Sequence, residues 1–276
     1  ISAKLVHWLR SNTERAMNIL FILKTRYAIK VNTNNKRFSP GRQPSSRHPG
    51  FVYQFYLNVL EGGETEEINR ISLLRKTLRN NNTEISITDF GTGISAKKKV
   101  SGIEKNVCVR HKYGKLLHRL VKYCNSQNIV EIGTSIGVSS CYLALANTDL
   151  KIISLEGSAE VAALAKRNHN ELKIRNVEVM IGNVNETLSA ALQNFPVVDL
   201  VFFDGNHTKQ ATLEYFNCCL EKANENSVFV FDDIYWSEEM SEAWNEIKLH
   251  PRVTLTIDVY QFGICFFRKE KLAKED

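Results

Sequence analysis

The sequence has no long apolar run. Residues 19–23, for example, contain five apolar residues and are followed by Lys24, whereas a membrane span needs about 20. No apolar run near the start leads into a small-residue cleavage site, so we predict neither a membrane association nor a secretory signal. The cysteines form no C-x-x-C pair and no zinc spacing, which favours buried thiols in a reducing cytoplasm. There are six: Cys108, Cys124, Cys141, Cys218, Cys219 and Cys265.

The composition is that of an ordinary globular protein. The 276 residues are 43% hydrophobic and 24% charged, which argues against a disordered or fibrous chain. This length is near the upper limit for one hydrophobic core. We therefore expect one α/β domain with an appendage, or two small domains.

Charge divides the chain into two unlike halves. Residues 1–127 carry 23 Lys and Arg against 8 Asp and Glu, whereas residues 128–276 carry 13 against 22. A basic half can bind nucleic acid or another anionic partner. It can equally be a basic helical domain docked on an acidic one. We favour the second reading because no aromatic-interleaved RNA-binding motif is visible.

The first 110 residues predict a helical region. Helices are expected at 2–30, 51–60 and 66–79, and the basic stretch 31–50, with its Asn, Ser, Pro and Gly, is expected to be a linker. We interpret residues 85–110 as a connecting segment that folds over the active site. The region would supply a lid, a substrate surface or a homodimer surface.

From residue 128 onward, strand-length β-branched runs alternate with helical stretches. This succession predicts a parallel sheet with helices on both faces. Only Gln261 separates the run 258–260 from the run 262–264, so the last two strands must pair antiparallel. The expected fold is a doubly wound, mainly parallel seven-stranded α/β sheet closed by an antiparallel terminal hairpin. The strands are expected at 128–132, 151–155, 176–181, 198–203, 227–231, 252–259 and 262–268. The helices are expected at 137–147, 158–172, 184–194, 207–224 and 236–249.

The first of these strands leads into a glycine turn that follows an acid. Glu131, Gly133 and Gly137 form an E-x-G-x-x-x-G pattern, with Thr134 and Ser135 inside the turn. Dinucleotide sites use G-x-G-x-x-G and place a pyrophosphate there, which disfavours a neighbouring carboxylate. An amino-acid cofactor with a free ammonium group would favour it. Alternatively, the turn merely joins a strand to a helix.

The next two strands also end in polar residues. Glu156, followed by Gly157, can accept hydrogen bonds from both ribose hydroxyls of an adenosine cofactor. Alternatively, Glu156 is a solvent-facing strand end or a helix-cap acid. Asn183 can bond the adenine edge or can be a simple turn residue.

This ordered series resembles the class I S-adenosyl-L-methionine-dependent methyltransferases. The resemblance covers about residues 128–268, and it implies that residues 111–276 form a Rossmann-like cofactor domain. It further implies that Glu131 holds the methionine part of the cofactor, that Glu156 holds its ribose, and that the glycine turn passes beneath it. The chain also resembles bacterial O-methyltransferase-like proteins.

Three carboxylates follow the fourth and fifth strands of this domain. Asp204, Asp232 and Asp233 would repel one another unless a cation neutralised them, and oxygen ligands suit Mg²⁺. The trio resembles the metal site of catechol-type and antibiotic-sugar O-methyltransferases. Alternatively, Asp204 orients the substrate or the cofactor's amino group, and Asp232 and Asp233 cap the following loop.

A proton acceptor is also sought near Asp204. Where the sugar enzymes have a second Asp, this chain has Asn206, so His207 is the nearest substitute for a base, unless it merely begins a helix. Tyr235 and Trp236 can wall an acceptor pocket or can be packing residues.

These observations predict an S-adenosylmethionine-dependent enzyme that methylates an oxygen of a small hydroxylated molecule, with or without Mg²⁺. Two alternatives stay open. One is an RNA-binding or RNA-modifying protein on the same fold, and the other is an NAD-dependent oxidoreductase.

Overall fold

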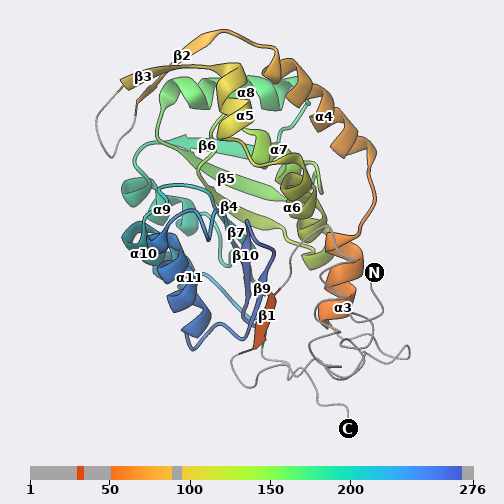
Figure 1. Ribbon diagram of the computed structural model, residues 1–276, viewed down its shortest axis with the longest axis vertical. Coiled ribbons are helices and arrows are strands. Elements are labelled where there is room, and N and C mark those ends of the chain that lie inside the picture. Colours follow the sequence, from red (N-terminus) through yellow and green to blue (C-terminus); the bar gives the residue numbers. More distant parts are fainter. Residues whose placement is uncertain (1–29, 34–50, 89–94, 269–276) are drawn as a thin grey trace, which may run out of the picture.

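An eight-stranded sheet forms the centre of the molecule (Figure 1). The computed structural model describes residues 30–33, 51–88 and 95–268. The strands lie in the order β1-β9-β10-β8-β7-β4-β5-β6. The five from β8 to β6 are parallel, and β10 runs antiparallel to both β8 and β9. The strands are β1 (Lys30–Thr33), β4 (Asn128–Ile132), β5 (Lys151–Glu156), β6 (Val177–Ile181), β7 (Leu200–Phe203), β8 (Val228–Phe231), β9 (Leu255–Asp258) and β10 (Gly263–Phe266).

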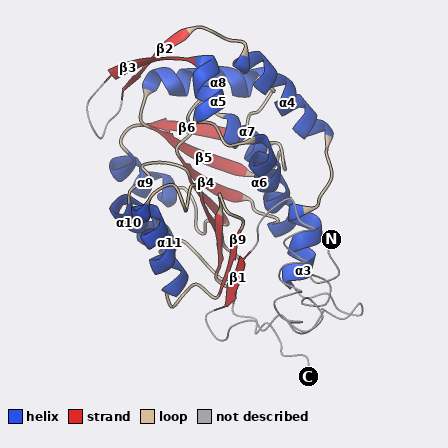
Figure 2. Cartoon of the chain, viewed as in Figure 1, coloured by secondary structure: helices blue, strands red, loops and turns tan. Residues whose placement is uncertain are grey.

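Helices cover both faces of the sheet, so the domain has three layers (Figure 2). Successive residues of a strand point to opposite faces. Ile129 and Ile152 thus pack in one core with α6, α7 and α8, whereas Val130 and Ile153 pack in the other with α9, α10 and α11. The helices are α6 (His111–Cys124), α7 (Val138–Ala144), α8 (Ala159–Glu171), α9 (Val184–Gln193), α10 (Lys209–Leu220) and α11 (Glu238–Leu249). The predicted seven-stranded sheet with its antiparallel hairpin is confirmed.

The eighth strand corrects one prediction. Residues 31–33 were expected in a linker, but β1 pairs antiparallel with β9, with Lys30 opposite Asp258 and Thr33 opposite Leu255. An edge strand such as β9 offers a row of unpaired backbone groups, which a short extended segment can satisfy whatever its composition. The rest of the predicted helix 2–30 and the remaining linker residues lie outside the described residues.

The N-terminal region packs through its helices on the same side of the sheet as α6. A short helix, α3 (Phe51–Phe55), continues as the π-helix η1 (Tyr56–Leu60), and α4 (Glu66–Arg79) follows as predicted. Ile71, Leu74 and Leu78 of α4 belong to the same core as α6 and α7. The core is therefore continuous across residue 110.

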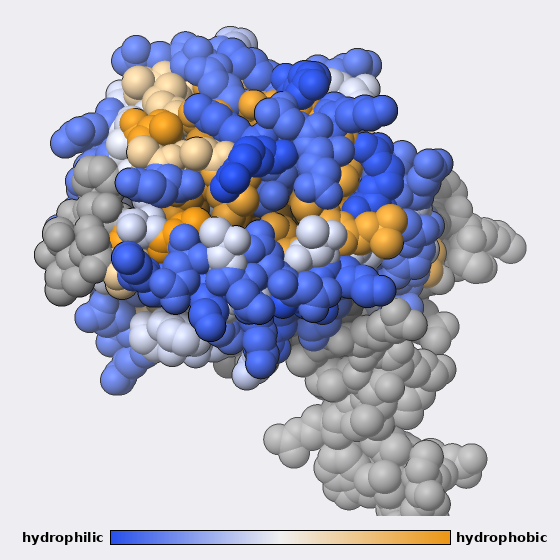
Figure 3. Space-filling view, turned by 90° about the horizontal axis from the view of Figure 1, so that it is seen from above, coloured by the Kyte–Doolittle hydropathy of each residue, from blue (hydrophilic) through white to orange (hydrophobic). Residues whose placement is uncertain are grey.

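Residues 85–110 form more than a connection. They contribute a hairpin of β2 (Glu84–Thr88) and β3 (Ser95–Lys99), and then α5 (Val100–Asn106). The hairpin lies against α8 (Figure 1). The Lys97–Lys99 run is exposed, and the face seen from above in Figure 3 is largely hydrophilic. The sequence analysis missed this antiparallel pairing of residues 84–88 with the basic segment 95–99.

Ion pairs do not explain how the basic half docks. Arg75 and Arg79 both contact Glu104, at 2.8 and 2.6 Å, and Lys209 contacts Glu242 and Glu246 at 2.9 and 2.6 Å. Each of these pairs joins residues of the same half. The shared core shows that apolar packing joins the halves. Among the described residues, no helix has the length and apolar character that crossing a membrane requires.

Candidate functional site

The predicted site residues meet at the carboxyl ends of the parallel strands. Backbone hydrogen bonds set the register: Asp204 N–H donates to Ile132 O at 2.8 Å, and Asp232 N–H donates to Phe203 O at 2.9 Å. These bonds place Asp204 beside the end of β4 and Asp232 beside the end of β7. Open α/β sheets bind ligands at this edge.

The turn after β4 requires both of its glycines. Gly133 has φ +99° and Gly137 has φ +80°, values that side-chain-bearing residues rarely adopt. A Cβ on Gly133 would overlap the carbonyl oxygen of Asp204, and one on Gly137 would lie 2.7 Å from His169 Nε2. The turn thus passes directly against β7 on one side and α8 on the other.

Glu156 fastens this turn to the end of β5. Its Oε2 accepts from Ser135 N–H at 2.8 Å, and its Oε1 accepts from Ser158 N–H at 2.9 Å. Burial raises the pKa of Glu156, while these bonds and one from the Gly157 backbone partly oppose the rise. An ionised carboxylate can accept about four hydrogen bonds, so Glu156 retains capacity for ribose hydroxyls.

Glu131 is fully buried beneath the turn. Ser154 Oγ donates to Glu131 Oε2 at 2.5 Å and also bonds Thr134 Oγ1 at 2.5 Å. The second oxygen, Oε1, is buried and lacks a hydrogen-bond partner within the described chain. Burial is the main cause that raises the pKa of Glu131 to about 7. A buried carboxylate oxygen without a donor fits a ligand that brings a cationic N–H group.

Asp204 and Asp232 form a carboxyl pair. Asp232 is 3% exposed, and Asp233 N–H donates to its Oδ1 at 2.8 Å. Burial, with the neighbouring acids, raises the pKa of both Asp204 and Asp232 well above the usual range. Each of these carboxyl groups therefore disfavours ionisation of the other.

No chemistry below depends on a metal ion. In the part of the chain that the structure describes, no group of three His, Cys, Asp or Glu side chains is already placed to hold one. The Mg²⁺ site at Asp204, Asp232 and Asp233 stays a prediction.

His207 lies beside Asp204, as predicted. Its Nε2 is 3.6 Å from Asp204 Oδ1, and 29% of its side chain is exposed. Asn206, between them, has φ +49°. The turn thus brings an imidazole and a carboxyl group together at the open edge.

Asn183 has the simpler of its two predicted roles. Its Oδ1 accepts from Asn185 N–H at 3.0 Å, which caps α9. The contact with adenine stays a prediction.

Exposed aromatic side chains flank the carboxyl pair. Trp236 is 74% exposed, Tyr260 65% and Tyr235 40%, and the rings of Tyr235 and Tyr260 are 6.1 Å apart. Tyr235 also donates a hydrogen bond to Asp258. The sequence analysis missed Tyr260, although its place in the terminal hairpin turn is a signal that could have found it.

A second missed contact comes from the segment before α6. The Cys108 thiol interacts with the Ser135 side chain and lies near Asp204, and burial raises its pKa to about 12. The adjacent Val109 carbonyl accepts from Arg75 Nη1 at 2.6 Å. Cys108 therefore lies beside the glycine turn. The folding of residues 85–110 over the active site stays a prediction.

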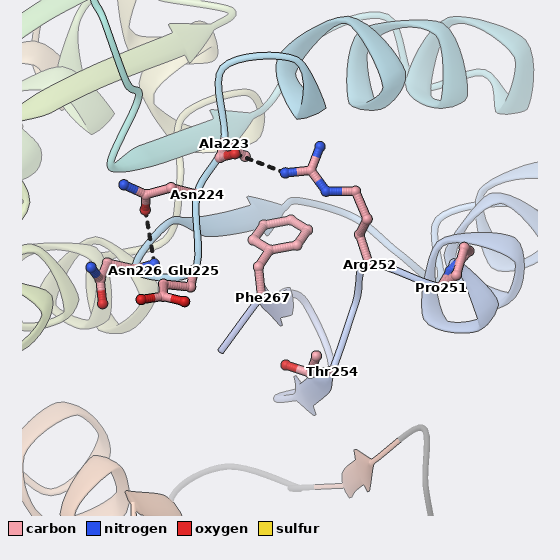
Figure 4. A pocket seen from close by; sticks show the side chains of 8 residues that line it. All are labelled: Ala223, Asn224, Glu225, Asn226, Pro251, Arg252, Thr254 and Phe267. Carbon is pink, nitrogen blue, oxygen red and sulfur yellow. Dashed lines mark hydrogen bonds between the residues drawn. The ribbon is translucent and has the colours of Figure 1, made fainter. Parts of the chain in front are cut away.

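A separate cavity of about 640 Å³ lies at the opposite edge of the sheet (Figure 4). Arg252 there donates to the Leu220 and Ala223 carbonyls at 2.6 and 2.7 Å, which ends α10. The cavity contains none of the predicted site residues. It is lined by Ala223, Asn224, Glu225, Asn226, Pro251, Arg252, Thr254 and Phe267.

Comparisons with known proteins agree with this geometry. Residues 130–234 match the family described as a methyltransferase domain. A catechol O-methyltransferase of Niastella koreensis is 27% identical over 131 residues, covering 46% of this chain and 58% of the relative. The alignment thus spans little more than half of that protein. A ribosomal RNA small subunit methyltransferase G of Fusobacterium nucleatum is 24% identical over 173 residues, covering 62% and 71% of the two chains.

Solved structures show the same fold. An O-methyltransferase of Streptomyces achromogenes, crystallised with S-adenosylmethionine, has a TM-score of 0.55 at 20% identity, covering 79% of this chain and 95% of that one. The resemblance predicted from the sequence is confirmed at the level of the matched domain and the fold. Residues 130–234 match a methyltransferase domain, and they lie within a fold of the class I S-adenosylmethionine-dependent methyltransferase type.

Proposed function

We propose that the protein transfers a methyl group from S-adenosylmethionine to a hydroxyl oxygen of a small molecule. The observation that carries this proposal is Glu131 Oε1, a buried carboxylate oxygen without a donor beneath a glycine turn. A cofactor with an α-ammonium group supplies the missing donor, whereas a dinucleotide pyrophosphate would be repelled.

The remaining cofactor contacts follow from the order of the strand ends. In this proposal Glu156, at the end of β5, accepts the ribose hydroxyls in addition to the Ser135 N–H that it already binds. Ile181, the last residue of β6, is 44% exposed, so it offers an apolar surface for an adenine ring beside Asn183. When bound, S-adenosylmethionine supplies an electrophilic methyl group.

The acceptor hydroxyl must lose its proton as its oxygen forms the new bond to carbon. We assign this proton to the imidazole of His207, whose Nε2 lies 3.6 Å from Asp204 Oδ1 at the carboxyl edge of the sheet. Tyr235, Trp236 and Tyr260 form the walls against which an acceptor ring can lie. Catalysis then rests mainly on alignment of the two reactants.

The test compares two ligands on two proteins, which isolates the contact between Glu131 and the ammonium group of the ligand. We expect Glu131→Gln to weaken binding of S-adenosylhomocysteine by roughly tenfold or more, because the ammonium loses its charged partner. The same substitution should change binding of a desamino analogue by less than about twofold. Isothermal titration of both ligands against both proteins measures this difference. Equal losses for the two ligands would assign Glu131 to scaffolding and remove the support for this cofactor.

A further inference from the structure

The last turn of α8 contacts the glycine turn after β4. Asn168 Nδ2 donates to the carbonyl of Ile136 at 2.8 Å, and His169 Nε2 lies 2.8 Å from Ser140 Oγ. Both α8 side chains are 4% exposed. Polar side chains buried this deeply must be hydrogen-bonded, because a buried polar group without a partner is destabilising.

The contact fits the backbone of the turn closely. Gly137 leaves no space for a Cβ, which would lie 2.7 Å from His169 Nε2 and 3.0 Å from the Ala165 side chain. Ser140 Oγ donates to Gly137 O at 3.1 Å. The Ser140 oxygen is then the acceptor for the imidazole N–H, so a hydrogen-bond chain runs from α8 into the turn.

The turn is linked to the buried carboxylate, because Ser154 Oγ bonds both Thr134 Oγ1 in the turn and Glu131 Oε2, each at 2.5 Å. Burial lowers the pKa of His169 to about 4, so its ring is neutral and has one donor nitrogen. α8 therefore influences the path of the turn and, through Thr134 and Ser154, the surroundings of Glu131.

We propose that Asn168 and His169 are positioning residues, which set the glycine turn and the orientation of Glu131 and thereby determine cofactor affinity without touching the cofactor. This inference rests on the proposed function. Neither residue lies in the motif region of the turn, and no role was expected for either from the sequence.

Asn176, which lies between α8 and β6, supplies a matched control. Asn176 Nδ2 donates to the carbonyls of Ala144 and Asn147, both at 3.1 Å, at the other end of α7. Asn176 thus makes the same kind of clamp as Asn168, but away from the turn. A merely structural role predicts equal consequences for the two asparagines.

The experiment measures the Kd of S-adenosylhomocysteine and the thermal midpoint for each variant of the full chain. We expect Asn168→Ala and His169→Ala to weaken binding roughly three- to tenfold, the worth of one hydrogen bond. Asn176→Ala should lower the thermal midpoint about as much as Asn168→Ala does, while leaving the Kd within about twofold of the wild type. His169→Gln, whose amide can reach the Nε2 position, should recover most of the affinity.

The possible failures are separable. If the wild type binds but Asn168→Ala and His169→Ala bind equally well, or Asn176→Ala weakens binding as much as they do, the positioning role is wrong. If His169→Ala does not fold, His169→Gln and Asn168→Ala decide the outcome by the same criterion. If the wild-type protein does not bind the ligand, the proposed function fails and this inference fails with it.

Discussion

At the scale of single residues, the site depends on how burial is compensated. Glu131 is fully buried, yet only one of its oxygens has a donor among the described residues. Desolvation favours the neutral form, whereas a bound ammonium would favour the ionised form. The protonation of this residue and the binding of the cofactor must therefore be linked.

Cofactor affinity should consequently depend on pH. The pKa of Glu131 is raised to about 7 in the ligand-free protein, so below pH 7 the carboxyl group must release a proton before it can hold an ammonium. We expect the affinity for S-adenosylhomocysteine to rise from pH 6 toward pH 7.5, by up to about tenfold per unit at the acidic end, and then to level off. Titration calorimetry in buffers of different ionisation enthalpy should show proton release at pH 6.

Glu131→Gln is the control for that experiment, because any pH dependence that it retains belongs to other groups, such as the Asp204 and Asp232 pair. An affinity that is flat between pH 6 and pH 8 in the wild type would contradict the linkage.

At the scale of elements, one buried acid joins the N-terminal helices. Glu104 of α5 contacts Arg75 and Arg79 of α4, and its side chain and that of Arg75 are 0% and 4% exposed. Arg75 also holds the Val109 carbonyl next to the glycine turn. The pairing therefore connects α4, α5 and the segment that lies on the site.

Removing that acid should be far more damaging than removing its exposed partner. We expect Glu104→Gln to destabilise the fold by about 3 kcal/mol, because Arg75 would remain buried without a counter-charge. The side chain of Arg79 is 56% exposed, so Arg79→Ala should lower the free energy of unfolding by at most about 1 kcal/mol. Urea unfolding of both variants measures the difference. Equal losses in the free energy of unfolding would show that the buried Arg75–Glu104 pair contributes no more than the exposed Arg79.

The elements also show how far sequence reasoning reaches. The parallel strands were predictable because each is a short run rich in β-branched or aromatic apolar residues. Their polar ends pointed to Glu131, Glu156 and Asp204. The strand β1 was missed because its pairing depends on the exposed edge of β9, which no local pattern reveals. The contacts of Asn168 and His169 were missed for a similar reason: they depend on where the end of α8 meets a turn 30 residues earlier.

At the scale of the whole molecule, the division of charge remains separate from the site. The basic N-terminal half packs on the sheet through an apolar core, so its exposed lysines in β3 are not used in docking. Binding to RNA would use such cations and would weaken steeply with salt. The methyl transfer that we propose takes place at the carboxyl edge of the sheet and does not use these lysines.

The most direct measurement is calorimetric titration of the full chain with S-adenosylhomocysteine, with NAD⁺ and single-stranded RNA as comparison ligands, each in Mg²⁺ and in EDTA. We predict saturable, roughly micromolar binding of S-adenosylhomocysteine at a stoichiometry near one, no binding of NAD⁺, and only weak, salt-sensitive binding of RNA. Binding of NAD⁺ alone, or saturable RNA binding without S-adenosylhomocysteine binding, would contradict the assignment of the glycine turn and Glu131 to this cofactor.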